Sequence, residues 1–334
     1  MQKFIIVDTS NMFFRVRHIA SKFSTPDEKV AFAMHLLMQS IAKCWKDFSN
    51  SGHNSHVVIA LEGRSWRKDF YEPYKKNRAA VRSAYTEKEQ EEDRLYWEGY
   101  EALTKYIEDK TNCTILRHPE AEADDMIARW IHSHPDAEHV IVSSDSDYYQ
   151  LINSNVSQYN GVTDEHITML GIFDAKGKII MDKKTKEPKM IGDPEWLLFE
   201  KCMRGDTSDN VFSAYPGAPK KSSKNRVGLI EAFSDRHAQG FAWNTVMLTK
   251  WIDHNQVQHR VLDDYQRNKT LIDLSAQPDE FKMKFDTTIK EQAVTKSNAA
   301  VGTNFLKFCG KHDLVRLAEQ STIFANLLSS PYHV

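Results

Sequence analysis

The stretch Val140–Asp147 reads Val-Ile-Val-Ser-Ser-Asp-Ser-Asp, an apolar run that ends in two carboxylates one residue apart. Such a run of β-branched residues is typical of a strand buried in a parallel sheet. Ligands of open α/β sheets bind outside the carboxyl ends of the strands. One aspartate after a strand is more often a turn residue or a helix cap. The stretch therefore decides the fold only if other strands end in the same way.

Three earlier apolar runs also lead into acidic residues. They are Phe4–Val7 before Asp8, Val57–Leu61 before Glu62, and Thr114–Leu116 before Glu120, Glu122, Asp124 and Asp125. Stretches with helical apolar spacing, such as residues 29–48, lie between the runs. This alternation predicts an α/β fold with a mostly parallel central sheet flanked by helices.

A basic and aromatic segment separates Glu62 from the third of these runs. Its cations are Arg64, Arg67, Lys68, Lys75, Lys76, Arg78 and Arg82, and its aromatic residues are Trp66, Phe70, Tyr71 and Tyr74. This composition suits phosphate contacts and base stacking on a nucleic-acid single strand. A solvated helix face with ordinary ion pairs is the alternative. The segment is also long for a crossover between two strands, which favours a functional role.

The second half of the chain is expected to be mainly helical. Before it, the pattern predicts short strands at residues 156–159 and 167–170 and a lysine-rich hairpin over residues 171–192. A helix at residues 194–203 leads to Asp206 and Asp209, and a basic loop follows them. We expect an α/β core over residues 1–190, with the basic excursion at about 64–110, and a mainly helical region over 191–334.

The composition excludes several classes of protein. The 334 residues are 41% hydrophobic and 27% charged, which is typical of a globular chain. The net charge of −2 predicts no nucleic-acid partner by itself, so any basic surface must be local. The four cysteines are widely spaced without a zinc pattern, and we expect them to be reduced thiols of a cytoplasmic protein. No apolar run approaches a membrane span, so we expect no membrane partner.

The acidic residues are the candidate metal ligands. If the sheet is parallel, nine of them meet at one edge: Asp8, Glu62, Glu122, Asp124, Asp125, Asp145, Asp147, Asp206 and Asp209. Clustered carboxylates repel one another unless a cation is bound. Hard oxygen ligands without cysteine or closely spaced histidine select Mg²⁺, with Mn²⁺ as a substitute. This number of acids suits two ions roughly 4 Å apart, an arrangement used in phosphoryl transfer.

Several motifs together resemble the 5′-nuclease (flap endonuclease) superfamily, which has a PIN-like core. They are Asp8, Glu122-Ala123-Asp124-Asp125, Ser144-Asp145-Ser146-Asp147 with Gln150-Leu151, Gly205-Asp206-Thr207-Ser208-Asp209-Asn210, and Tyr74-Lys75-Lys76-Asn77-Arg78. Their order along the chain is that of the family. The resemblance covers nearly the whole chain and implies a helical arch and a smaller, mainly helical C-terminal domain.

The resemblance also implies roles for individual residues. Asp8, Glu62, Glu122 and Asp124 resemble the first metal site, and Asp145, Asp147, Asp206 and Asp209 the second, with Asp125 nearby. Lys75 and Arg78 are the expected catalytic cations at the scissile phosphate. The expected nucleic-acid contacts come from the arch and from the duplex-binding loop at about 204–233. They are Arg67, Lys76 and Arg82 in the first and Lys220, Lys221 and Lys224 in the second. Arg15, which lies outside both, is a further candidate at the scissile phosphate.

Two departures from the family pattern stand out. Glu62 occupies a position where the family more often has aspartate, and its longer side chain could shift the first metal. The duplex-binding loop lacks the glycine-rich spacing of other members, which puts a K⁺ ion bound by its backbone carbonyls in doubt.

The resulting hypothesis is a Mg²⁺-dependent 5′→3′ exonuclease and flap endonuclease. It would act as a monomer on 5′ flaps, nicks, duplex ends and RNA–DNA hybrid, and remove RNA primers in phage DNA replication in the host cytoplasm. Its products would carry 5′-phosphate and 3′-hydroxyl ends. The family is associated with sliding-clamp and single-strand-binding-protein partners. Two alternatives remain open: a catalytically inactive nucleic-acid-binding module, and an aspartyl phosphatase in which Asp145 attacks phosphorus.

Overall fold

The computed structural model describes residues 2–19, 25–49 and 55–333. The chain divides into two compact units. Unit 1 comprises residues 1–65, 84–191 and 282–334, and unit 2 comprises residues 66–83 and 192–281. The predicted division into domains at residue 190 stays a prediction.

The strands of unit 1 form one mixed sheet. Within the described residues it has seven strands in the order β3-β2-β1-β4-β5-β6-β7. Their bounds are β1 Lys3–Asp8, β2 Ser55–Ala60, β3 Thr114–Leu116, β4 Glu138–Val142, β5 Val156–Asn160, β6 Glu165–Thr168 and β7 Gly171–Phe173. The first five are parallel, and β6 and β7 are antiparallel to their neighbours. The predicted mostly parallel α/β sheet is confirmed.

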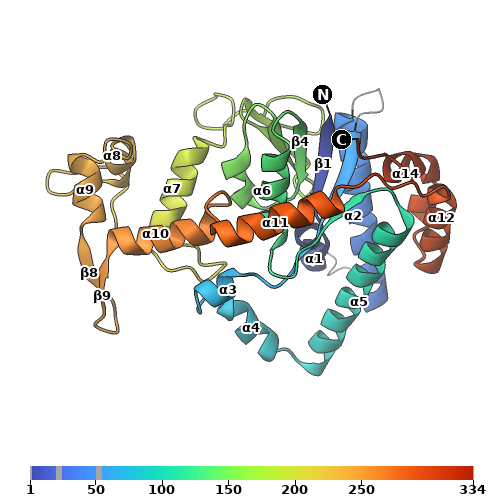
Figure 1. The fold of residues 1–334 in the computed structure, drawn as a ribbon, viewed down its shortest axis with the longest axis horizontal. Coiled ribbons are helices and arrows are strands. Elements are labelled where there is room, and N and C mark those ends of the chain that lie inside the picture. Colours follow the sequence, from blue (N-terminus) through green and yellow to red (C-terminus); the bar gives the residue numbers. More distant parts are fainter. Residues whose placement is uncertain (1, 20–24, 50–54, 334) are drawn as a thin grey trace. The chain divides into compact units, whose positions relative to one another are not determined.

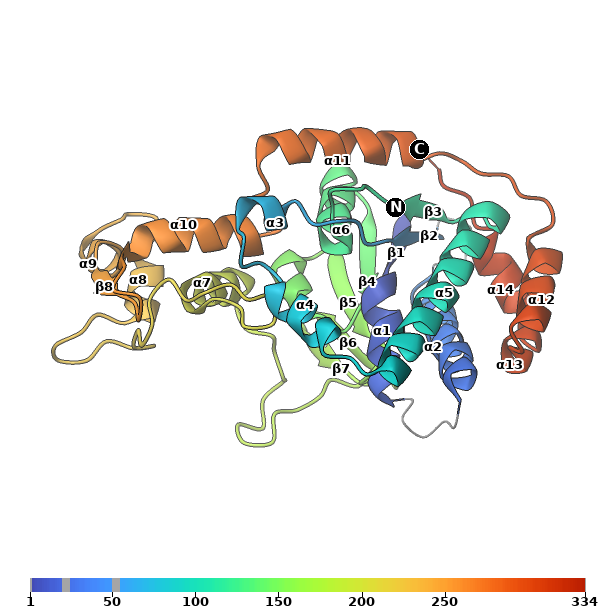
Figure 2. The ribbon, with the colours of Figure 1, turned by 90° about the horizontal axis from the view of Figure 1, so that it is seen from below.

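Helices cover both faces of this sheet (Figures 1 and 2). Ile5 and Val7 of β1 belong to a buried cluster with α2 (Pro26–Phe48) and α5 (Glu87–Lys110). Phe4 points to the other face and makes an edge contact with Trp130 of α6 (Ala123–Ser133), with ring centroids 5.0 Å apart. Because successive strand residues alternate between faces, an apolar strand needs cover on both sides. The remaining helices of unit 1 are α1 Thr9–Ile19, α12 Val301–Lys311, α13 Val315–Ala318 and α14 Ser321–Leu328, with a 3₁₀ helix η2 at Ser146–Leu151.

Unit 2 is mainly helical and has its own core. Its helices are α3 Arg67–Phe70, α4 Lys76–Ser83, α7 Pro194–Arg204, α8 Leu229–Ser234, α9 Phe241–Met247 and α10 Val261–Ile272; α11 Asp279–Gln292 begins in unit 2 and continues into unit 1. Phe199, Met203, Leu229 and Val261 lie in one buried cluster. A short hairpin, β8 Lys250–Ile252 with β9 Gln258–Arg260, joins α9 to α10 and was not predicted from the sequence.

None of the helices in the described residues combines the length and apolar content needed to cross a bilayer. The four cysteines are buried and free.

Candidate metal centre

Parallel strand pairing brings the predicted acids of unit 1 to one edge of the sheet. The register pairs Asp8 with Ala60, and Val7 with Val142. Glu62 and Asp145 therefore follow their strands at the same end as Asp8. Glu122 precedes α6, whose first turn contains Asp124 and Asp125. Single ligand oxygens of these last three residues lie within 4.8 Å of one another, close enough to hold a metal ion.

Asp8 is the last residue of β1 and is buried, with 5% of its surface exposed. Its Oδ2 accepts hydrogen bonds from Ser143 Oγ at 3.1 Å and from the Tyr148 hydroxyl at 3.0 Å. Burial raises the pKa of the Asp8 carboxyl to about 6, and the negative charge of Asp145 adds to the increase. A bound cation would relieve this buried charge.

Glu62 is connected to both Asp8 and the start of α6. Ser10 Oγ donates to Glu62 Oε1 at 2.8 Å and to Asp8 Oδ1 at 3.4 Å. Glu62 Oε2 accepts the Ala123 N–H at 3.3 Å. We call the edge of the sheet that carries Asp8, Glu62, Asp145 and the group Glu122, Asp124 and Asp125 the acidic edge. The glutamate that replaces the usual aspartate thus still brings its carboxylate to this edge. The expected shift of the first metal stays a prediction.

Tyr148 is a buried tyrosine, and the charges of several of these acids affect the pKa of its hydroxyl. Its side chain is almost fully buried, and burial raises the pKa of its hydroxyl far above the ordinary value. The charges of Asp8, Asp124, Asp145 and Glu62 raise it further. The charges of four predicted ligands thus act on one buried hydroxyl, and Asp8 is the one that it contacts directly. Sequence reasoning missed Tyr148, although it directly follows Asp147.

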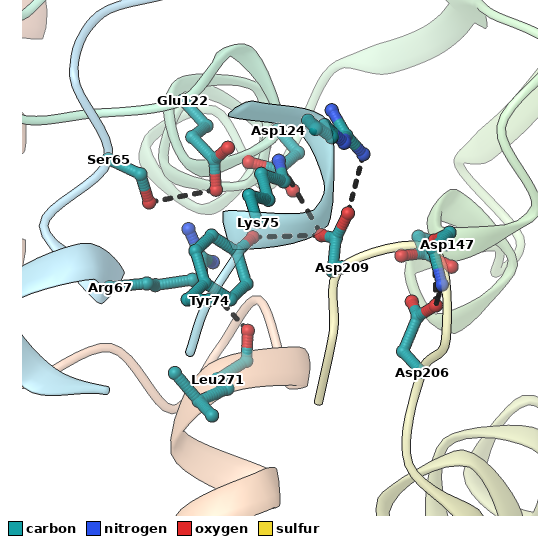
Figure 3. A network of polar contacts seen from close by, with 12 residues as sticks. Ser65, Arg67, Tyr74, Lys75, Glu122, Asp124, Asp147, Asp206, Asp209 and Leu271 are labelled. Atoms are coloured by element: carbon teal, nitrogen blue, oxygen red, sulfur yellow. Dashed lines mark hydrogen bonds and ion pairs between the residues drawn. The ribbon is translucent and has the colours of Figure 1, made fainter. Parts of the chain in front are cut away.

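Hydrogen bonds hold the other acids of unit 1 in place. Ser65 Oγ donates to Glu122 Oε2 at 2.9 Å (Figure 3), and the Glu122 N–H donates to Asp125 at 3.1 Å. Asp145 accepts the Asp147 N–H at 3.0 Å and thereby caps η2. Asp145 is therefore a helix cap through its Oδ1, one of the two roles that the sequence suggests. It also lies close enough to Asp8 for its charge to act on that residue.

Asp206 and Asp209 belong to unit 2, in the loop after α7. Asp206 binds Lys201 Nζ at 2.7 Å and accepts the Ser208 N–H at 2.8 Å. Although burial opposes it, the charge of Lys201 lowers the pKa of Asp206.

Asp209 contacts both predicted phosphate-binding cations, Lys75 and Arg78. It accepts from the Tyr74 hydroxyl at 2.9 Å and lies 2.5 Å from the Arg78 guanidinium and 3.5 Å from Lys75 Nζ (Figure 3). The Lys75 N–H also donates to the Asp209 carbonyl at 2.8 Å. Lys75 has a φ of 55°, a left-handed conformation that a lysine adopts at a cost of about 1 kcal/mol or more. The bonds to Asp209 hold that conformation.

The basic and aromatic segment is only partly exposed. Arg67 is fully buried, donates to the Leu271 carbonyl at 2.7 Å and lies over the Trp66 ring. This position leaves it no exposed guanidinium for a phosphate, contrary to our expectation. Trp66 and Tyr74 are also buried and cannot stack on bases as predicted. All residues of α4 are exposed, including Lys76 and Arg82, as are Arg15, Lys220, Lys221 and Lys224.

Gly63 joins the two loops that present Glu62 and Glu122. Its N–H donates to the Ala121 carbonyl at 2.8 Å, and a Cβ at this position would lie 2.1 Å from the His118 carbonyl oxygen. We expect Gly63→Ala to destabilise the fold by about 1–3 kcal/mol, because backbone atoms must move. Thermal unfolding would show a midpoint lowered by about 2–4 °C per kcal/mol. Gly310→Ala is the control, because nothing lies within 4 Å of its added Cβ in α12 and alanine favours the helix. Equal midpoints for Gly63→Ala and wild type would contradict this packing.

Comparisons with known proteins show to which family the chain belongs. Residues 3–184 match the family model for the 5′-3′ exonuclease, N-terminal resolvase-like domain. That match covers more than half of the chain, so the chain belongs to this family of 5′-3′ exonucleases, and the superfamily resemblance is confirmed.

The ribonuclease H of a T-even bacteriophage, the kind of relative that the motifs suggest, is among the matches. Ribonuclease H of Enterobacteria phage T4 is 27% identical over 274 residues, which is 76% of each chain. DNA polymerase I of Rhizobium leguminosarum is 26% identical over 238 residues, 69% of this chain but only 20% of the polymerase. The chain is similar in fold to a bacteriophage T5 flap endonuclease solved as a pseudo-enzyme-product complex with DNA and metal ions. That comparison has a TM-score of 0.52 and 19% identity, and covers 87% of this chain and 98% of the T5 chain.

Proposed function

We propose that this protein is a divalent-metal-dependent 5′→3′ exonuclease and flap endonuclease. It would cut 5′ flaps, nicked DNA and RNA–DNA hybrid, and remove RNA primers during phage replication. The observation that carries the proposal is the gathering of carboxylates at one edge of the sheet. Ser10 bonds to both Asp8 and Glu62, Glu62 accepts a bond from the start of α6, and oxygens of Glu122, Asp124 and Asp125 lie within 4.8 Å of one another. A protein that only bound nucleic acid would gain nothing from these acids except repulsion of phosphates.

The donor set of this edge fits Mg²⁺ or Mn²⁺. It consists of carboxylate oxygens without cysteine or histidine, which hard cations prefer. Asp8, Glu62, Glu122 and Asp124 would hold one ion, and Asp145 and Asp147 would contribute to a second, together with Asp206 and Asp209. When bound, such ions supply Lewis-acid polarisation of the phosphodiester and a water of lowered pKa. Ser143 and Tyr148 orient Asp8, and Ser10 orients Glu62, so that their lone pairs are presented in a fixed direction.

Lys75 and Arg78 are the proposed phosphate-binding cations. Both side chains contact Asp209, and Arg78 also lies in the exposed helix α4. We infer that phosphate oxygens of the substrate replace Asp209 as the partner of Lys75 and Arg78. The hydrogen bond from Tyr74 keeps Asp209 in place during this exchange. Phosphate contacts carry no base information, so cleavage would tolerate different sequences and weaken with salt.

Cleavage of 5′-labelled flap, nicked and RNA–DNA hybrid substrates tests the proposal. With Mg²⁺ we expect short 5′ products with 3′-hydroxyl ends, and with EDTA no product. Binding without cleavage in Mg²⁺ and in Mn²⁺ would contradict the proposal and favour the inactive binding module. Trapping of a phosphoenzyme with a small phosphomonoester would instead favour the phosphatase.

Lys75→Ala should lower kcat for flap cleavage by about a hundredfold, the effect of removing one charge-stabilising donor from a transition state. The substrate Kd, measured in EDTA, should change much less because other cations also contact the backbone. Lys250→Ala is the control, since Lys250 is an exposed lysine of β8 in the same unit. A fall in affinity equal to the fall in kcat would assign Lys75 to general binding.

A further inference from the structure

A cavity of about 490 Å³ opens beside Glu62 in unit 1. Its lining combines three cations, Arg64, Arg117 and Lys296, with Glu62, Glu108 and His118. Ile115, Pro119 and Val294 form its apolar part. The volume lies in the range of small-molecule sites, about 300–1,000 Å³, and is sufficient for one nucleotide. Of the lining residues, Glu62 alone has a role in the acidic edge assigned above, and Lys75 and Arg78 do not belong to the lining.

Hydrogen bonds of the backbone keep the wall of the cavity in shape. The Arg64 N–H donates to the Pro119 carbonyl at 2.8 Å. The Gln292 side chain pairs with the edge of the sheet, because its Oε1 accepts the Arg117 N–H at 3.0 Å and its Nε2 donates to the Arg117 carbonyl at 2.8 Å. The guanidinium of Arg117 takes no part in this pairing. It can therefore be replaced without removing the pairing that fixes the wall.

The charge of the lining favours an anion. Arg117 lies 3.7 Å from the Glu108 carboxylate, and Lys296 Nζ donates to the Glu108 carbonyl rather than to a carboxylate. Glu62, the other acid, already accepts from Ser10 and from the Ala123 N–H. The lining thus contains three cations and two carboxylates, and Ser10 and the Ala123 N–H already bind one of these carboxylates, that of Glu62.

His118 adds a neutral donor to the lining. Its Nδ1 accepts the Glu120 N–H at 3.1 Å, so the ring proton is on Nε2. Burial lowers the pKa of His118, and the ring is therefore neutral near pH 7. A phosphate group accepts hydrogen bonds from guanidinium, ammonium and imidazole N–H groups alike.

We propose that this cavity is a nucleotide subsite, in which Arg64, Arg117 and Lys296 bind a phosphate group of the strand being cut. The inference rests on the proposed function, because Glu62 joins the cavity to the acidic edge where the strand would be cleaved. The apolar residues of the lining accommodate a sugar or a base face without reading its sequence. The same phosphate chemistry is offered by a free nucleoside monophosphate, which the experiment below separates from the strand.

The test is the double variant Arg117→Gln/Lys296→Gln, which removes two charges and keeps the backbone pairing with Gln292. Its control is Lys311→Gln/Arg316→Gln, which removes one lysine and one arginine from exposed positions of α12 and α13. Binding is measured in EDTA by fluorescence anisotropy with a short, 3′-labelled single-stranded DNA at several salt concentrations. A nucleoside monophosphate is titrated separately, and flap cleavage is measured with Mg²⁺.

We expect the cavity variant to bind the strand about tenfold more weakly than the control. The slope of log K against log salt should be shallower by about 0.7 for each phosphate that the variant no longer neutralises. Flap cleavage should show a raised KM with kcat near that of wild type. If wild type also binds the monophosphate and the variant does not, the cavity accepts free nucleotide as well; without such binding, it serves the strand alone.

Equal affinity and equal salt slopes in the cavity variant and the control would overturn the subsite. Because this arm is measured without metal, it can be read even if wild type fails to cleave. If wild type does not cleave flaps but the cavity variant binds the strand more weakly than the control, the proposed nuclease activity is contradicted and the proposed phosphate site is supported. A melting midpoint equal to that of wild type shows that the variant folds.

Discussion

Asp145→Asn is expected to abolish cleavage while leaving DNA binding largely intact. Asparagine keeps the side-chain oxygen that accepts the Asp147 N–H and caps η2, so the local fold should survive. It removes the negative charge that lies near Asp8 and that a metal ion would need. A metal contributes several kcal/mol to the stabilisation of the transition state. At a factor of ten for each 1.36 kcal/mol, the loss should be about a thousandfold or more.

Asp193→Asn is a matched control for that variant. Asp193 caps α7 by accepting the Glu195 N–H at 3.0 Å, the same bond that Asp145 makes. The control tests the cap chemistry without the acidic edge and should cleave like wild type. Undiminished cleavage by Asp145→Asn with Mg²⁺ would refute the metal assignment. Loss of DNA affinity together with cleavage would show a folding defect instead.

Asp8→Asn should separate stability from activity. The folded-state pKa of Asp8 is raised to about 6 from the ordinary 3.8. Below pH 3.8 both the folded and the unfolded chain bind the proton, and the Asp8 carboxyl then does not lower the free energy of unfolding. As the pH rises to about 6, the unfolded chain loses the proton first, so this group destabilises the metal-free protein above that window. The full difference corresponds to at most about 3 kcal/mol.

The metal-free variant should therefore be more stable than wild type at pH 7. The net gain should be about 1–2 kcal/mol, since asparagine cannot accept all the bonds from Ser10, Asn11, Ser143 and Tyr148 and each lost bond costs about 1 kcal/mol. Urea unfolding at pH 4 and pH 7 measures this, and the advantage should shrink at pH 4. Saturating Mg²⁺ should reverse the order, because an ion at a hundred times its Kd adds about 2.7 kcal/mol to wild type only.

Asp273→Asn provides the contrast. Asp273 is also buried, but it accepts from Ser275 and lies 3.9 Å from Lys269 Nζ, so its neutralisation should destabilise the protein. Stabilisation by both variants would mean that removing any buried charge helps. Destabilisation by Asp8→Asn in EDTA would contradict the account of the acidic edge.

The sheet could be read from the sequence because its strands are buried on both faces. Apolar runs at Phe4–Val7, Val57–Leu61 and Val140–Val142 are continuous, and each leads to an acid at the same edge of the sheet. The predicted helix over residues 29–48 is α2, and the helix at 194–203 is α7. The carboxyl ends of parallel strands lie at the same edge of a sheet, and this rule alone predicts that the acids at the strand ends lie close together.

Other features depended on residues that are distant in sequence. Arg67 sits in a basic segment, but its burial is decided by the Leu271 carbonyl, 204 residues away. Tyr148 became part of the site through its bond to Asp8, 140 positions earlier. The β8–β9 hairpin is held around Asp253, which accepts the N–H groups of Asn255 and Val257. Its strands have only three residues each and show no clear alternation of apolar and polar side chains, so the sequence pattern does not indicate them.

Metal counting tests the central claim most directly. Metal-free wild type would be titrated with Mn²⁺, and the free ion followed by electron paramagnetic resonance. The account predicts saturable binding of about two ions per chain in wild type. Asp193→Asn should bind the same number, whereas Asp145→Asn should lose at least one ion. No saturable binding by wild type, or the same stoichiometry in Asp145→Asn, would contradict the assignment of the acidic edge as a metal centre.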